Sequence, residues 1–282
     1  MRGPAAGGYK ERRVTPSALN PIGVFDSGVG GLTVYKALRT VLPCESFVYL
    51  GDTARLPYGT KSAETVAQYA LQAARRLMRE EIKLLVVACN TASALALPVL
   101  RNSLDGVACL GVIEPGAREA ARTSKTGHIA VLATESTVRS GSYAAAIRSF
   151  RPDAEVRMLG CNLLVSLAEA GWHEGPEAEA VIARYLCELG TGFDTLVLGC
   201  THFPLLVPAI RNRIGPEIAI VDSAVTTARS VRDYLAAHNL RSPSTESGTT
   251  QFWATDTPEC FTRIAWPFLG DEAMPPVLHV QL

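Results

Sequence analysis

Short apolar runs alternate along the chain with longer segments in which apolar residues recur at helical spacing. Recurrence every ~3.6 residues indicates amphipathic helices, and short runs bounded by turn residues indicate strands buried on both faces. The expected strands are 21–26, 46–51, 82–89, 107–113, 128–134, 154–159, 194–200, 218–223 and 251–256. The expected helices are 31–40, 62–80, 92–103, 139–149, 161–170, 176–190 and 224–240. This alternation predicts an α/β fold in which mostly parallel sheets are covered by helices on both faces.

The same pattern occurs twice in the chain. Asp26 ends the first expected strand and Cys89 ends the third, and in the second half Thr134 and Cys200 hold the equivalent positions at nearly the same spacing. The two halves therefore look like copies of one doubly wound α/β module. Ligands of such sheets bind at the carboxyl ends of the strands. We expect two pseudo-symmetric domains with the active site in the cleft between them, and both thiols facing that cleft.

Charge and composition exclude several classes of protein. Lys and Arg together number 27, as do Asp and Glu, so the formal net charge is zero, whereas nucleic-acid-binding proteins usually carry a basic excess. No apolar run approaches the roughly 20 residues of a membrane-spanning helix, and the N-terminal stretch has no apolar core of a signal peptide. We expect a cytoplasmic protein with a flexible tail at 1–20 and without membrane or nucleic-acid partners.

Cysteine usage points in the same direction. The chain has seven cysteines; an odd number without a CxxC pair argues for a reducing compartment and against a disulfide framework. No Cys/His cluster has the spacing of a metal site. Free cysteines are most often buried and inert. We therefore expect Cys44, Cys109, Cys187 and Cys260 to be structural thiols without a chemical role. Cys89 and Cys200 differ, because each stands at a strand end beside a helix N-terminus, where free N–H groups and the helix dipole lower the pKa of a thiol.

Two further polar residues stand close to these thiols. The segment DSGVGG at 26–31 follows the first strand, but it does not fit the GxGxxG pattern of nucleotide sites, and its acid would repel a phosphate. Asp26 is level with Cys89 and can bind a substrate ammonium or tune the thiol; alternatively it caps the next helix. His202 is the histidine that stands beside a candidate nucleophile or base.

Three kinds of function fit these residues. Cys200 with His202 is typical of a cysteine-nucleophile hydrolase, but this interpretation gives Cys89 no role. Two thiols on opposite walls of a cleft fit an enzyme that inverts a carbon centre, because one group removes a proton from one face while the other delivers a proton to the opposite face. A non-catalytic amino-acid-binding or regulatory protein is the third possibility. Exchange of the substrate α-hydrogen in D2O separates racemisation from hydrolysis.

Several ordered segments are similar to one known family. They are IGVFDSGVGGLTV (22–34), YLGDTARLPYGTKS (49–62), VVACNTASA (86–94), GVIEPGAREA (111–120), TESTVRSGSY (134–143) and LGCTHFPLL (198–206). From about residue 22 to about residue 270, the chain resembles the glutamate racemases of the cofactor-independent aspartate/glutamate racemase superfamily. The number and order of the segments make this match more specific than any single motif.

The resemblance implies an isomerase that interconverts L- and D-glutamate and supplies D-glutamate for peptidoglycan synthesis. It implies that neither pyridoxal phosphate nor a metal takes part. The implied two-base pair is Cys89, which serves the D enantiomer, and Cys200, which serves the L enantiomer. Asp26 and His202 match residues that assist the first and the second thiol, respectively.

The resemblance also implies substrate contacts. Besides Asp26 and His202, the matching residues are Ser27, Tyr58, Gly59, Asn90, Thr91, Thr134, Thr137 and Thr201. Glu169 matches a glutamate that the family places beside the second cysteine, although CNLL at 161–164 departs from the usual CP. Phe203 replaces the usual tyrosine after the histidine, a mild change.

Domains and partners follow from the same likeness. In the family the end of the chain returns to the first module, so the expected domains are 21–112 with 223–282, and 113–222. We expect glutamate as the substrate, no cofactor, and a homodimer. A racemase of aspartate or of another amino acid would keep both cysteines, and the length of the side-chain pocket distinguishes these substrates.

Overall fold

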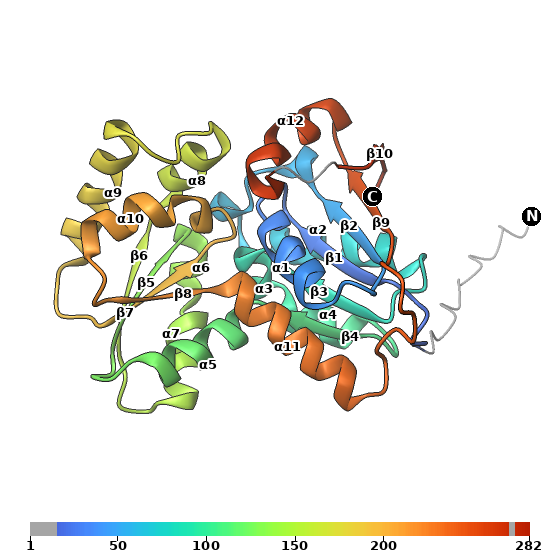
Figure 1. Ribbon diagram of the computed structural model, residues 1–282, viewed down its shortest axis with the longest axis horizontal. Helices are drawn as coiled ribbons and strands as arrows, with labels where there is room; N and C mark the ends of the chain where they lie inside the picture. The colour runs from blue at the N-terminus through green and yellow to red at the C-terminus, as the bar shows by residue number, and fades with distance from the viewer. Residues whose placement is uncertain (1–15, 271–273) are drawn as a thin grey trace, which may run out of the picture.

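The computed structural model describes residues 16–270 and 274–282 and shows two parallel-sheet α/β domains side by side (Figure 1). The first sheet has the order β10-β9-β2-β1-β3-β4. Its strands are β1 (Ile22–Asp26), β2 (Phe47–Gly51), β3 (Leu84–Val87), β4 (Ala108–Gly111), β9 (Thr250–Ala254) and β10 (Val277–His279). The second sheet has the order β6-β5-β7-β8. Its strands are β5 (His128–Ala133), β6 (Glu155–Gly160), β7 (Thr195–Gly199) and β8 (Ala219–Asp222).

All the pairings of these strands are parallel, which confirms the expected fold class. The two sheets also share one strand order. In the first sheet β1 lies between β2 and β3, with β4 beyond, and in the second sheet β5 lies between β6 and β7, with β8 beyond. The direction of strand addition therefore reverses at β1 and at β5, and ligands of α/β sheets bind beside such switch points.

Helices cover the faces of both sheets. They are α1 (Leu32–Val41), α2 (Ala63–Met78), α3 (Asn90–Leu95), α4 (Leu97–Ser103), α5 (Ile113–Thr123), α6 (Glu135–Ser140), α7 (Ser142–Phe150), α8 (Asn162–Glu169), α9 (Pro176–Leu189), α10 (Val207–Ile214), α11 (Ser223–Ala237) and α12 (Pro258–Leu269). Short 3-10 turns are η1 (Thr53–Arg55), η2 (Tyr58–Thr60) and η3 (Phe203–Leu206). In the part of the chain that the structure describes, no helix is long and apolar enough to cross a membrane.

Successive side chains of a central strand enter different cores. Val24 of β1 packs in a cluster with Leu38 of α1 and Val231 of α11, whereas the next residue, Phe25, packs in a cluster with Leu77 of α2. Burial of each such side chain contributes ~1.5–3 kcal/mol to folding. Because both faces of the strand are buried, the sequence shows an unbroken apolar run rather than an alternating one.

The C-terminal segment extends the first sheet. β9 pairs with β2, and β10 pairs with β9. The strands thus lie on the far side of the first domain from the second sheet (Figure 1). The division of the chain at residues 112 and 222 stays a prediction. Of the expected tail, residues 1–15 lie outside the described residues.

Some elements differ from the expectation. The expected helix at 92–103 is two helices, α3 and α4, and the expected helix at 139–149 begins earlier as α6 and continues as α7 after Gly141, whose φ is 66°. Helices α10 and α12 and strand β10 were not expected. Both helices carry proline at the first or second position, where its missing N–H costs nothing. The strand exists through its pairing with β9.

Candidate active site

One cavity brings the two cysteines together. Cys89 follows β3 and Cys200 directly follows β7, so both lie at the carboxyl ends of the third strands of their sheets. Both line a cavity of about 510 Å³. Its wall consists of Ser27, Leu56, Pro57, Tyr58, Gly59, Thr60, Cys89, Asn90, Thr91, Thr134, Asn162, Leu163, Val165, Ser166, Glu169, Cys200, Thr201 and His202. The two halves of the chain both contribute to this wall.

Cys89 is a buried thiol at the start of a helix. It is the N-cap of α3, and its Sγ accepts the N–H of Ala92 at 3.4 Å. The thiol lies 3.5 Å from Oγ of Ser27. Burial and the neighbouring Asp26 raise the pKa of Cys89 to about 12. The helix N-terminus was expected to lower this pKa, but the contribution of one N–H is outweighed by desolvation and by a nearby carboxylate.

Asp26 lies behind the cavity wall rather than in it. It ends β1, its side chain is fully buried, and its Oδ2 accepts the N–H of Gly28 at 2.8 Å. Oδ1 has no hydrogen-bond partner among the described residues. Burial raises the pKa of Asp26, against the opposing effect of His202.

Cys200 stands at one end of a chain of polar contacts. Its Sγ lies 3.6 Å from Nδ1 of His202, and Nε2 of His202 lies 3.0 Å from Oε1 of Glu169. Burial alone would lower the pKa of His202, but its contacts with Cys200 and Glu169 outweigh this and raise it to about 10. The imidazolium form persists at neutral pH and supplies a positive charge beside the second thiol. Glu169 reaches this position from the last residue of α8.

The glycines of 26–31 allow the two halves to approach each other. A methyl group on Gly30 would overlap the ring of His202 and Oγ1 of Thr201, and one on Gly31 would lie 2.5 Å from Cβ of Asp26. Thr33 also donates to the carbonyl of Thr201 at 3.0 Å. The segment thus serves close contact between elements rather than phosphate binding, in agreement with its departure from GxGxxG.

Hydroxyl groups bridge the two halves on the other side of the cavity. Oγ1 of Thr91 lies 3.0 Å from Oγ1 of Thr134, which lies 2.9 Å from Oγ1 of Thr137. Thr134 also caps α6 through the N–H of Thr137. Thr137 is fully buried and stands behind the wall, whereas the other two threonines line the cavity. Next to them, Ser136 donates to the carbonyl of Gly59 at 2.6 Å.

Asn90 presents an unpartnered donor. It follows Cys89 directly, it is 2% exposed, and it lines the cavity. Its Oδ1 accepts the hydroxyl of Tyr143 at 2.7 Å, but its Nδ2 has no partner among the described residues. A buried amide NH2 without an acceptor costs free energy, and a ligand carboxylate would supply one.

The structure adds residues that sequence reasoning missed. The hydroxyl of Tyr58 donates to the buried Asp52, which also accepts from Thr255 at 2.8 Å. Asp52 follows β2 as Asp26 ends β1, so its strand-end position was the available signal. Besides the expected Glu169, helix α8 supplies four wall residues that were not expected, Asn162, Leu163, Val165 and Ser166, and its start at the carboxyl end of β6 was the corresponding signal.

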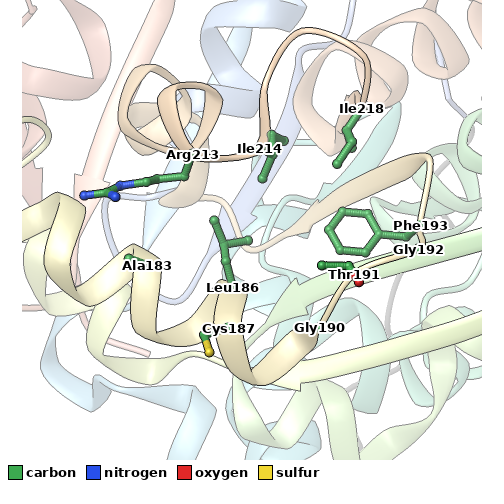
Figure 2. Close-up of a pocket in the computed structure, with 10 residues that line it drawn as sticks. All are labelled: Ala183, Leu186, Cys187, Gly190, Thr191, Gly192, Phe193, Arg213, Ile214 and Ile218. Atoms are coloured by element: carbon green, nitrogen blue, oxygen red, sulfur yellow. The ribbon is translucent and has the colours of Figure 1, made fainter.

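A second cavity lies at the other end of the second sheet. Figure 2 shows it between α9, α10 and the segment before β7; its volume is about 380 Å³. Apolar side chains such as Leu186, Phe193 and Ile214 line it, together with Cys187. None of the candidate site residues is among those that line it.

Lysines and metal ligands do not gather at the first cavity. Lys83 is buried at the amino end of β3, where its Nζ lies 2.5 Å from Oε2 of Glu45. Among residues 16–270 and 274–282, no group of three His, Cys, Asp or Glu side chains is arranged to hold a metal ion. The cavity is instead lined by two thiols, one imidazole, one carboxylate and several hydroxyl and amide groups. These groups can transfer protons and bind carboxylates.

Comparison with known proteins agrees with this site. The model of the Asp/Glu/Hydantoin racemase family matches residues 22–231. A glutamate racemase of Geobacter metallireducens is 50% identical over 250 residues, which is 88% of this chain and 92% of the relative. The crystal structure of glutamate racemase from Thermus thermophilus, with β-chloro-D-alanine, has 42% identity and a TM-score of 0.86 and covers 94% of this chain and 98% of its own.

A further solved structure has a bound amino acid. Glutamate racemase from Francisella tularensis, in complex with D-glutamate, has 33% identity and a TM-score of 0.87, over 94% of this chain and 98% of its own. These similarities extend over nearly the whole length of both chains, on a fold in which two strand-end thiols share a cavity. The chain therefore belongs to the Asp/Glu/Hydantoin racemase family, within which it is an isomerase of the glutamate racemase group.

Proposed function

We propose that the chain interconverts L- and D-glutamate by two-base proton transfer, with Cys89 and Cys200 as the catalytic residues. The observation that carries the proposal is the placement of both thiols at equivalent strand ends on the wall of one shared cavity. A substrate α-carbon between the two sulfur atoms presents one face to each of them. Inversion by proton transfer requires this arrangement, because one face loses a proton and the other gains one.

The two thiols have complementary surroundings. In the L-to-D direction, the Cys200 thiolate removes the α-proton and becomes a thiol, while the Cys89 thiol gives its proton to the opposite face of the carbanion and becomes a thiolate. The protonated ring of His202 places a positive charge beside Cys200, with Nδ1 3.6 Å from Sγ. Burial and the carboxyl group of Asp26 raise the pKa of Cys89 and favour the starting thiol. The D-to-L direction exchanges the roles.

The neutral polar groups that line the cavity bind the substrate. Nδ2 of Asn90 is an unpartnered buried donor, and Ser27, Thr91, Thr134 and Thr201 add hydroxyl groups. Fixed donors of this kind hold carboxylates and stabilise the negative charge that develops when the α-proton leaves. The bound D-glutamate of the Francisella tularensis relative supports glutamate as the substrate. No cofactor takes part in this proposal.

Circular dichroism of L-glutamate solutions tests the proposal. The purified chain should abolish the optical signal of L-glutamate without added cofactor, and much more slowly that of L-aspartate or L-alanine. Cys89→Ala and Cys200→Ala should each abolish racemisation, whereas Cys187→Ala, which changes an exposed thiol in the second cavity, should not. Near-wild-type racemisation by either of the first two variants would rule out the two-base mechanism.

Deuterium incorporation separates the alternatives. In D2O the α-position of glutamate should take up deuterium as it racemises; turnover of an amide or ester without such exchange would instead indicate a hydrolase, and tight binding without turnover a binding protein. The same proposal has two further parts. The chain supplies D-glutamate for peptidoglycan synthesis in the cytoplasm, and it forms a homodimer. Light scattering during size-exclusion chromatography measures the latter directly, and a monomer mass would contradict it.

A further inference from the structure

The hydroxyl of Tyr143 crosses from one half of the molecule to the other. Tyr143 is the second residue of α7, in the helical layer of the second sheet, and its side chain is fully buried. It donates at 2.7 Å to Oδ1 of Asn90, which begins α3 and directly follows Cys89. The neighbouring Ser142 donates at 3.3 Å to the carbonyl of Ala94, also in α3. Two consecutive residues of α7 therefore hold the helix that carries the first thiol.

The ring of the same tyrosine packs against the strand that carries the second thiol. A methyl group on Gly199, the residue before Cys200, would lie 3.0 Å from Cε2 of Tyr143. Tyr143 thus contacts the last residue of β7 with its ring and the first residue of α3 with its hydroxyl. A side chain at position 199 would be crowded both by this ring and by the carbonyl of Leu132 on the neighbouring strand, which favours glycine before the second cysteine.

The direction of the hydrogen bond fixes the direction of the Asn90 amide. Burial raises the pKa of Tyr143, so the phenol keeps the hydrogen that it donates to Oδ1 of Asn90. A donor at Oδ1 leaves the NH2 group on the other side of the carboxamide, and Nδ2 has no partner among the described residues although it is buried. Without the phenol, the carboxamide could rotate and present its oxygen to a carboxylate, which would repel it.

We infer that Tyr143 is a positioning residue: its hydroxyl orients the Asn90 amide as a donor for the substrate carboxylate, and its ring sets the spacing of the two cysteine-bearing strand ends. This role rests on the proposed racemisation, because it concerns the same cavity. It concerns binding more than proton transfer, since Tyr143 is not among the residues that line the cavity and acts through Asn90.

A double-mutant cycle tests the inference. Tyr143→Phe keeps the ring and removes the hydroxyl; it should raise the KM for the amino acid that the wild type racemises about fivefold to tenfold, as expected for one buried hydrogen bond, with a smaller change in kcat. Asn90→Ala should raise KM at least as much. In the double variant, Tyr143→Phe should add nothing to the effect of Asn90→Ala, because residues that act as a unit are not additive.

Tyr35→Phe is the matched control. It removes another buried tyrosine hydroxyl, one that lies 3.0 Å from Oγ1 of Thr250 in the first domain, so it should lower the melting temperature comparably and leave KM unchanged. An unchanged KM in Tyr143→Phe, or multiplicative effects in the double variant, would overturn the inference while the proposed function stands. Absence of racemisation by the wild type would instead overturn the proposed function itself.

Discussion

Nε2 of His202 lies 3.0 Å from Oε1 of Glu169, and the opposite nitrogen of the ring lies 3.6 Å from the sulfur of Cys200. The side chains of Glu169 and Cys200 thus contact opposite nitrogens of one ring, and both stabilise the positive charge of protonated His202. Because the two contacts leave from opposite sides of the ring, Glu169 affects the second thiol without touching it.

Glu169→Gln should therefore lower both the activity and the pKa of His202. Each pKa unit corresponds to ~1.4 kcal/mol, so loss of one unit should reduce kcat/KM about tenfold at alkaline pH. The reduction should be equal for L- and D-glutamate, because the two enantiomers have the same free energy and the equilibrium constant is one. Polarimetric rates in both directions measure this, with Glu174→Gln, which changes an exposed glutamate in the segment after α8, as the control.

The same contact makes stability depend on pH. The pKa of His202 is raised from 6.5 to about 10 on folding, so its contribution is fully present below pH 6.5 and is lost as the pH rises through about 10. Urea unfolding at intervals from pH 6.5 to 10.5 should show a decline that ends at a lower pH, and is smaller in total, in Glu169→Gln, because the substitution lowers the folded-state pKa and leaves the unfolded-state pKa unchanged. Identical curves for the two proteins would contradict the assignment of the charge to this pair.

Asp26→Asn should slow turnover on the order of 10²-fold while some glutamate binding remains. The substitution removes the negative charge that helps to raise the pKa of Cys89, so this thiol becomes a weaker base. Alkylation of Cys89 by iodoacetamide, followed by peptide mass spectrometry against pH, should shift to lower pH. Asp194→Asn, which changes a carboxylate at the amino end of β7 that binds Ser124, should leave that titration in place.

Gly30→Ala should nearly abolish racemisation without unfolding the chain. The added methyl group would overlap His202 and Thr201, so the two halves must separate and the thiols lose their common substrate. Gly116→Ala is the counterpart, because its methyl group would meet Tyr143 at an ordinary 3.6 Å and alanine favours the helix interior by up to ~1 kcal/mol. Rates and melting curves of both variants provide the comparison, and an active Gly30→Ala would show that close approach at this point is unnecessary.

Lys83→Met should lower stability without lowering kcat. Lys83 is fully buried against Glu45, and removal of one partner of a buried ion pair costs ~3–5 kcal/mol. The pair lies at the amino end of β3, opposite the cavity, so the folded variant should keep the wild-type kcat at low temperature. Urea unfolding measures the first effect and initial rates measure the second; a loss of kcat in the fully folded variant would contradict this separation.

Much of the fold was legible in the local pattern. A short unbroken apolar run, such as that of β1, predicts a strand covered on both faces, and in the structure Val24 and Phe25 are buried in different cores. Helices α10 and α12 were not predicted, because a proline such as Pro208 or Pro258 usually indicates a break in a helix. In the structure both prolines lie in the first turn of their helix, where proline is tolerated. Strand β10 has three residues, and pairing alone makes it a strand.

The sequence by itself determined the two α/β repeats, because hydrophobic periodicity is a local property, and it determined the two cysteines at equivalent strand ends. The tertiary structure decided their surroundings. The approach of Gly30 to His202, the contact of Glu169 with that ring and the bridge from Tyr143 to Asn90 all join residues far apart in the chain. Such contacts depend on how the two sheets pack, and packing also decided that Cys89, at a helix N-terminus, has a raised rather than a lowered pKa.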